Sequence, residues 1–198
     1  MSKTSITNRR RSSVLALGGT TRKNSTSERA LNIAVEELRS AGVEVTVIAG
    51  PDLLLPMFDP DNLADDPRVR LLQDAVHNCD GMLISSASYH GGVPGLLKNA
   101  IDYIDAADPR RPYLDGRAVG CIACAGGWQA TGSTLTALRA MVHALRGWPV
   151  PLGVAINTTQ KLFSESGDCL DPHVAESLRK MAQQVLEFIR MRELAKAC

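Results

Sequence analysis

Short β-rich runs alternate along this chain with segments that have a helical period, and this alternation restricts the possible folds more than any other feature. Strands of a few residues that alternate with longer helices are typical of βαβ units. The pattern predicts five strands, at Ser13–Leu17, Val43–Ala49, Gly81–Ser85, Ala118–Ala123 and Leu152–Ile156.

The segments between these runs carry helical signals. In the first of them, apolar residues recur at i, i+3, i+4 and i+7 from Leu31 to Leu38. Asp66-Pro67 and Asp171-Pro172 each read as a helix start, since proline is favoured at the first helical position. Of the remaining two helices, one is expected to begin at Pro94 and the other to end at Gly147.

Five strands alternating with five helices predict an α/β protein with a parallel sheet. Because crossovers between parallel strands are right-handed, few topologies remain. A doubly wound five-stranded sheet of order 2-1-3-4-5, with helices on both faces, fits the 198 residues. Ligands of such sheets bind beyond the carboxyl ends of the strands, so the loops after Leu17, Ser85 and Ala123 are the ones to examine.

Length and composition indicate one domain. We assign residues 1–12 to a flexible N-terminal tail and residues 13–198 to a single domain. The net charge of +1 argues against a nucleic-acid-binding surface across the whole chain and leaves only a local basic patch open. No apolar run approaches the roughly 18 residues of a membrane helix, and Val14–Leu17 behind Arg9-Arg10-Arg11 is too short for a signal peptide. We therefore expect a cytoplasmic protein that binds neither nucleic acid nor membrane.

The cysteines and histidines do not form a metal or disulfide pattern. Five cysteines at irregular spacing predict free thiols. Cys121 and Cys124 have the spacing of a redox or zinc motif, but residues three apart on a strand point to opposite faces, and we expect both to be buried. The histidines are scattered and no G-x-S-x-G elbow is present, so we expect neither a metal site nor a serine triad.

The first loop, Leu17–Leu31, leaves a strand and enters a helix, and it is rich in hydroxyls. A helix N-terminus favours anions, and Arg22 adds a permanently charged fork. Both the P-loop and the G-x-G-x-x-G fingerprint are absent. The loop therefore predicts a phosphate site of another kind, while Ser25-x-x-Glu28 also matches a simple capping box.

The second loop is glycine-rich, because Gly91-Gly92 and Gly95 bracket Pro94 at a helix start. Such a turn lets backbone groups approach a flat ligand. This segment resembles the P-E-Y-N-x-x-x-P-G-x-L-K-N-A-I-D signature of NAD(P)H-dependent FMN reductases of the flavodoxin-like superfamily. The matching residues are Tyr89, Pro94, Gly95, Leu97, Lys98, Asn99, Ala100, Ile101 and Asp102. Gly19–Ser25 is similar to the family's G-S-x-R-x-x-S phosphate loop.

Several residues depart from the family pattern. Ala87 and Ser88 stand in place of Pro-Glu, His90 in place of Asn, and Thr20 in place of Ser. Thr20 keeps a hydroxyl for a phosphate. His90 is either a solvated loop residue or a titratable group near the flavin. Lys98 and Asn99 are interpreted as structural.

The resemblance implies three sets of FMN contacts. The phosphate would be bound by Thr20, Arg22, Ser25 and Ser27. The ribityl chain and the isoalloxazine ring would contact Ser88, Tyr89, His90 and Gly91. The ring edge would be covered by Gly126, Gly127 and Trp128. Tyr89, Trp128 and Tyr113 are candidates for the second-substrate pocket, with ordinary packing as the alternative.

The resemblance also implies the chemistry. NADPH or NADH would pass hydride to FMN N5, and an acceptor would then use the same face in a ping-pong scheme. No protein side chain is required as a catalytic residue. The acceptor would be a small molecule, such as a quinone, azo dye or metal ion, or reduced FMN would go to a flavin-dependent monooxygenase. Less favoured alternatives are a flavodoxin-type electron carrier, which usually has an acidic chain and a T-x-T-G-x-T loop, and a regulatory domain without turnover.

Relatives in this family form dimers or tetramers, so a homodimer or homotetramer is expected. The Pro/Asp-rich segment Gly50–Asp66 is interpreted as a lid, an oligomer contact or a plain surface connection. Arg110-Arg111 would either meet the 2′-phosphate of NADPH or remain solvated.

Overall fold

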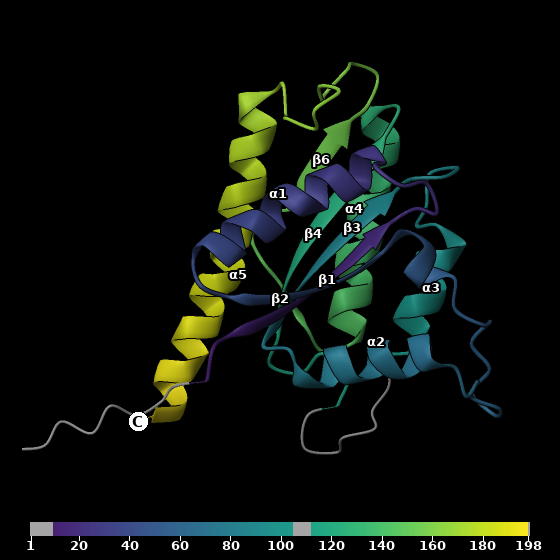
Figure 1. Cartoon of the computed structure of the whole chain (residues 1–198), viewed down its shortest axis with the longest axis vertical. Helices are drawn as coiled ribbons and strands as arrows, with labels where there is room; N and C mark the ends of the chain where they lie inside the picture. Colours follow the sequence, from purple (N-terminus) through teal and green to yellow (C-terminus); the bar gives the residue numbers. More distant parts are fainter. Residues whose placement is uncertain (1–9, 105–111, 198) are drawn as a thin grey trace, which may run out of the picture.

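A six-stranded parallel sheet forms the centre of the protein, in a computed structural model that describes residues 10–104 and 112–197 (Figure 1). Its order is β2-β1-β3-β4-β5, with β6 also paired to β4, which confirms the predicted strand order. The strands are β1 (Ser13–Gly19), β2 (Glu44–Ala49), β3 (Gly81–Ala87), β4 (Ala118–Ala125), β5 (Trp148–Pro149) and β6 (Val154–Asn157).

The fifth predicted strand is the one that differs. The predicted strand Leu152–Ile156 corresponds to β6, which begins at Val154 and pairs with the end of β4. An additional two-residue strand, β5, pairs with the start of β4. Pro149 and Pro151 lie between the two pairings, and a proline has no N–H to give to a ladder. β5 and β6 are therefore separate strands, and Leu152 lies outside both.

The described residues form five α-helices, as predicted: four connect successive strands, and the last follows β6. They are α1 (Thr26–Ser40), α2 (Pro67–Asn78), α3 (Gly95–Asp102), α4 (Trp128–Ala144) and α5 (Pro172–Ala197), with a short 3-10 turn, η1, at Gly50–Leu53. Helix α4 ends before the expected Gly147, because Arg146 adopts a left-handed φ of 63° and the Gly147 N–H donates to Val142 O.

The helices cover both faces of the sheet (Figure 1). Helices α1 and α5 pack on one face and α2, α3 and α4 on the other, which gives two apolar clusters. Cys124 belongs to the first cluster and Cys121 to the second, which confirms that these thiols are buried on opposite faces. Burial raises the pKa of each thiol to about 12.

The segment Gly50–Asp66 is fastened to α3. Asn99 Oδ1 accepts the Phe58 N–H at 2.8 Å, and its Nδ2 donates to Pro56 O at 2.8 Å. The Tyr103 hydroxyl donates to the same carbonyl at 3.2 Å. Asn99 thus has the structural role expected of it, while a lid or oligomer contact for this segment remains a prediction.

The chain start is described only from residue 10. Arg10 donates to both carboxylate oxygens of Asp80 at 2.6 and 2.8 Å, and the Ser12 hydroxyl donates to Glu193 at 3.2 Å. The rest of the predicted tail, and Arg110-Arg111, lie outside the described residues. Among the helices in residues 10–104 and 112–197, none combines the length and the apolar character needed to cross a membrane.

Candidate functional site

A cavity of about 230 Å³ lies at the carboxyl ends of β1, β3 and β4. The sheet topology alone predicts a ligand site there. Of the predicted residues, it brings together Thr20, Arg22, Ser25, Ser27, Ser88, Tyr89 and Gly126. His90, Gly91, Gly127 and Trp128 do not line it. The cavity adds Thr26, Ala87, Cys124, Ala125 and Thr158.

Strand β1 reaches this cavity through a very close approach to β3. A Cβ atom on Gly18, whose φ is 154°, would lie 2.2 Å from Ser85 O. The buried Ser85 hydroxyl in turn donates to Ser27 O at 2.8 Å. The start of α1 is therefore anchored on β3, and this fixes the predicted phosphate loop over the sheet.

The phosphate loop is ordered by its own side chains. Thr20 is only 5% exposed, and its Oγ1 accepts the Arg22 N–H at 3.1 Å. Ser25 caps α1 by accepting the Glu28 N–H at 3.3 Å, and its hydroxyl lies 3.2 Å from that of Ser27. The capping interpretation is thus correct for Ser25. Because the cap accepts only one of the orphan N–H groups of the first turn, others remain for an anion.

Glu28 departs from an ideal capping box. Its carboxylate accepts the backbone N–H of Asn24 at 2.7 Å, one residue earlier than the box requires. Asn24 has a left-handed φ of 57°. Arg22 is exposed and lines the cavity, and among the described residues it takes part in no ion pair. A free guanidinium beside helix N–H groups is suited to bind a phosphate.

The second loop forms a tight turn. Tyr89 and Gly92 exchange both backbone hydrogen bonds, each at 3.1 Å. His90 and Gly91 between them have φ values of 54° and 80°, as a type I′ turn requires. Histidine tolerates this left-handed region better than most residues, so His90 can stand where the family pattern has Asn.

Helix α4 holds this turn in place. The Thr134 hydroxyl donates to Ser88 Oγ at 2.7 Å, and the Ser133 hydroxyl donates to Gly91 O at 2.9 Å. Thr134 and Ser133 both lie in the first two turns of α4. The turn at 88–91 is therefore attached to α4, the helix that directly follows the loop at 126–128.

The outer part of the site is open. Tyr89 is 55% exposed and Trp128 is 67% exposed, and Cβ atoms on Gly126 or Gly127 would meet nothing within 4 Å. Tyr113 is not part of this region. It precedes the amino end of β4, and its ring lies 5.5 Å from the Arg146 guanidinium. The suggestion that Tyr113 lines a second-substrate pocket is therefore wrong for this chain.

Thr158 is the lining residue that lies outside the three loops singled out from the sequence. It directly follows β6, and its N–H donates to Ala125 O at 2.7 Å. The signal was available, because the end of the fifth predicted strand lies at the same edge of the sheet as the other three. Within residues 10–104 and 112–197, no cluster of three or more His, Cys, Asp or Glu side chains could hold a metal ion.

Comparisons with known proteins agree with this geometry. Residues 12–161 match the family described as NADPH-dependent FMN reductase. The chain is 25% identical over 181 residues to an NAD(P)H-dependent FMN reductase of Pseudomonas aeruginosa, covering 89% of this chain and 95% of that one. It is 27% identical over 120 residues to an FMN-dependent NADPH-azoreductase of Staphylococcus aureus, covering 60% of this chain and 61% of that one.

A solved structure shows the same fold. The flavoenzyme FerB of Paracoccus denitrificans, an NAD(P)H:(acceptor) oxidoreductase, superposes with a TM-score of 0.73 over 91% of this chain and 98% of its own, at 19% identity. The family match covers most of the sheet, including the loops after β1, β3 and β4. The chain therefore belongs to the NADPH-dependent FMN reductase family, and it is a flavodoxin-like, FMN-using oxidoreductase.

Proposed function

We propose that this protein oxidises NADPH or NADH and reduces FMN held in the cavity at the ends of β1, β3 and β4. The observation that carries the proposal is the convergence of a hydroxyl-rich helix start with two glycine-rich turns on one cavity. The first suits a phosphate and the others suit a flat ring.

The inner part of the site fits the phosphate of FMN. Thr20, Ser25 and Ser27 place hydroxyls around the start of α1, and Arg22 adds a charge that no described carboxylate neutralises. Hydrogen bonds to a charged group contribute about 1.5–3 kcal/mol each. Three or four of them, less the association cost, support binding at about micromolar strength.

The outer part fits a ring that stays accessible. Pockets that enclose a drug-sized ligand measure about 300–1,000 Å³, so a cavity of about 230 Å³ accommodates the phosphate end rather than the whole cofactor. Ser88, Tyr89, His90 and Gly91 would then contact the ribityl chain and one side of the ring. Gly126, Gly127 and Trp128 would lie along its edge, where missing Cβ atoms allow close approach.

When bound, FMN would supply the redox chemistry, namely hydride acceptance from nicotinamide and electron transfer to an acceptor in a ping-pong scheme. The protein contributes placement and backbone dipoles. We assign no catalytic side chain. The open face beside Tyr89 and Trp128 gives the nicotinamide and the acceptor room to exchange.

The acceptor is proposed to be a small molecule or a flavin-dependent monooxygenase that takes reduced FMN. The similarity to the Staphylococcus aureus azoreductase favours an acceptor reduced while FMN stays bound. We further propose a homodimer or homotetramer. Cys121, Cys124 and Cys169 are free thiols, which suits a reducing compartment and supports a cytoplasmic location.

A titration with FMN tests the phosphate assignment. In Arg22→Ala, FMN affinity measured by quenching of flavin fluorescence should fall about 10- to 100-fold, with an unchanged unfolding midpoint because Arg22 is exposed. Lys23→Ala is the matched control, since Lys23 is an adjacent exposed cation that does not line the cavity. Equal FMN affinity in the wild type and Arg22→Ala would refute the assignment of Arg22.

Steady-state kinetics separate the candidate activities. NAD(P)H oxidation by the FMN-loaded protein should give parallel double-reciprocal lines when the acceptor is varied. A colourless protein that needs added FMN for turnover would show FMN used as a substrate, whereas a yellow protein would show it retained. Absence of NAD(P)H oxidation would favour a non-enzymatic electron carrier of the flavodoxin type.

A further inference from the structure

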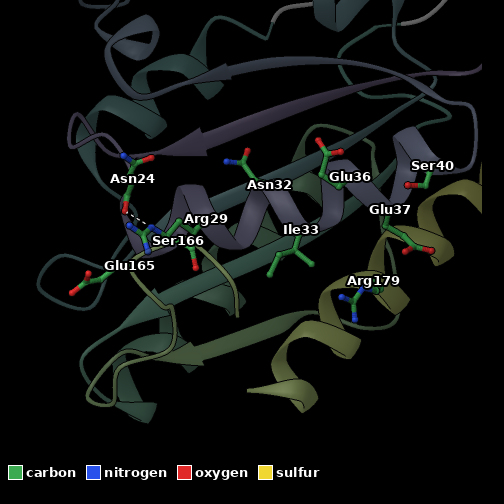
Figure 2. Close-up of a pocket in the computed structure, with 11 residues that line it drawn as sticks. Asn24, Arg29, Asn32, Ile33, Glu36, Glu37, Ser40, Glu165, Ser166 and Arg179 are labelled. Atoms are coloured by element: carbon green, nitrogen blue, oxygen red, sulfur yellow. Dashed lines mark hydrogen bonds between the residues drawn. The ribbon is translucent and has the colours of Figure 1, made fainter. Parts of the chain in front are cut away.

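Arg29 lies behind the phosphate loop, on the side away from the cavity. It projects from the first turn of α1 into a groove of about 580 Å³ between α1, α5 and residues 165–167 (Figure 2). This groove contains none of the predicted site residues. Arg29 is nevertheless connected to the phosphate loop, as Figure 2 shows by its hydrogen bond to Asn24.

Two side chains of α1 hold the two backbone groups of Asn24. Glu28 Oε2 accepts the Asn24 N–H at 2.7 Å, and Arg29 Nε donates to the Asn24 carbonyl at 3.0 Å. Asn24 is the residue with a left-handed φ of 57°. The strained turn of the phosphate loop is therefore fixed from both sides by the helix that follows it.

The direction of the Asn24 carbonyl determines the direction of the next N–H. In a planar trans peptide, the C=O of one residue and the N–H of the next point in opposite directions. Arg29 draws the Asn24 carbonyl toward the groove. The Ser25 N–H is therefore directed to the other side, where Ser25 lines the cavity.

Arg29 also reaches the loop between β6 and α5. Its Nη1 donates to Ser164 O at 2.9 Å, and its guanidinium carbon lies 5.9 Å from the centre of the Phe163 ring. Phe163 is 7% exposed and forms a bridge with Cys169. The same loop begins at Thr158, a lining residue of the cavity. One guanidinium thus links the loops on two sides of the anion site.

We propose that Arg29 is a positioning residue for the FMN phosphate, acting without touching it. It fixes the Asn24 peptide so that the Ser25 N–H faces the anion, and it holds the β6–α5 loop, which carries Thr158, against the phosphate loop. This inference rests on the proposed phosphate site. It assigns the preference for FMN over riboflavin partly to a residue outside the cavity.

The test compares FMN with riboflavin, which lacks the phosphate. Dissociation constants for both flavins are measured by fluorescence quenching in the wild type, Arg29→Ala, Arg29→Lys and Arg22→Ala. Arg39→Ala is the matched control, because Arg39 is also on α1 but pairs with Glu36 and the Val45 carbonyl. In Arg29→Ala we expect FMN affinity to fall about tenfold and riboflavin affinity to change less than about twofold.

Arg29→Lys separates geometry from charge. Lysine keeps the positive charge near the phosphate but has a single nitrogen in place of the planar fork that serves two carbonyls. Its FMN affinity should remain about threefold or more below the wild type. Complete recovery in Arg29→Lys would show that charge alone acts, and it would overturn the positioning role.

The remaining outcomes distinguish the two proposals. If Arg22→Ala loses the preference for FMN while Arg29→Ala keeps it, the phosphate site stands and the role of Arg29 is overturned. If affinity for both flavins falls equally in Arg29→Ala, the residue is only structural and the inference is again overturned. If the wild type binds FMN and riboflavin equally, the phosphate site and the inference fail together.

Discussion

The two ends of the candidate site are built differently. At the phosphate end, Thr20 and Ser27 are 5% and 2% exposed, and hydrogen bonds within the loop and from Ser85 fix their surroundings. At the ring end, Tyr89 and Trp128 are 55% and 67% exposed, and the neighbouring glycines have free space around them. One end is preorganised, and the other is open.

This difference suggests a division of labour. A preorganised anion site binds without further ordering cost, so the phosphate end should provide most of the cofactor affinity. An open ring end leaves the reactive face accessible to two successive substrates. If this division holds, cofactor affinity and stability depend on the inner end of the site, and exchange of substrates depends on the outer end.

The largest expected effect is a difference in stability when the same substitution, glycine to alanine, is made at each end of the site. In Gly18→Ala the new Cβ would lie 2.2 Å from Ser85 O, so β1 and β3 must separate, at a cost of about 3 kcal/mol. In Gly126→Ala the Cβ meets nothing within 4 Å, and we expect less than about 0.5 kcal/mol. The free energy of unfolding in urea measures both. Similar losses in the two variants would contradict the contrast between a packed and an open end.

The next prediction concerns the buried hydroxyl of the phosphate loop. Thr20→Val keeps the shape but leaves the Arg22 N–H without its acceptor at 3.1 Å and removes a proposed phosphate ligand. We expect FMN affinity to fall by about 2 kcal/mol, or about 30-fold. Thr21→Val is the control, because Thr21 is exposed and does not line the cavity. Unchanged FMN binding in Thr20→Val would indicate that backbone N–H groups alone hold the phosphate.

Sequence reasoning recovered the inner end better than the outer end. The phosphate loop is local in sequence, so its hydroxyls, Arg22 and the cap at Ser25 could all be predicted from one strand-to-helix stretch. The order of the strands followed from alternation and the handedness of crossovers. Local chemistry and regular periodicity were sufficient for these features.

Features that depend on distant residues could not be predicted in this way. The bonds from Thr134 to Ser88 and from Ser133 to Gly91 join segments more than 40 residues apart. The predicted order placed the end of the fifth strand at the correct edge of the sheet, but that Thr158 itself reaches the cavity depends on the pairing of β6 with the end of β4. Tyr113 was proposed for a substrate pocket on its residue type, yet the fold places it at the amino end of β4. Arg29 carries no sequence signal that distinguishes it from other surface arginines.

A third prediction concerns the pH dependence of stability. It compares two buried thiols of β4, one at the cavity and one on the opposite face of the sheet. Burial raises the pKa of Cys124, which lines the cavity, and of Cys121, on the opposite face, to about 12. The unfolded thiols ionise near pH 9, so between pH 9 and 12 the unfolded state binds fewer protons than the folded state. Stability must therefore fall as the pH rises through this range.

Each thiol should lower the free energy of unfolding by about 1.4 kcal/mol between pH 8 and pH 10. Because lysines and tyrosines titrate in the same range, the share of each thiol is the difference in slope between the wild type and Cys121→Ala or Cys124→Ala. With saturating FMN, Cys124 should make the same contribution to the slope of the free energy of unfolding against pH, since an anion beside the thiol opposes its ionisation in the folded state. A slope that is the same in all three proteins would show that the thiols ionise alike in the folded and unfolded states, and it would contradict a pKa raised by burial.

The smallest effect on FMN affinity is expected at the outer end, and it is the most informative about turnover. Trp128 starts α4 beside the glycines and is two-thirds exposed, so Trp128→Ala removes at most one aromatic contact to the ring, worth about 1 kcal/mol or less than about fivefold in FMN affinity. The KM for NAD(P)H or for the acceptor should rise by a larger factor if Trp128 lines the second-substrate pocket beside the edge of the ring. Trp148→Ala is the control, since Trp148 is 55% exposed but lies in β5 and packs on Phe188, away from the cavity.

The opposite outcome would contradict the division of labour between the two ends. If Trp128→Ala weakens FMN binding as strongly as Arg22→Ala while leaving both KM values unchanged, the ring end serves to bind the cofactor and not to exchange substrates.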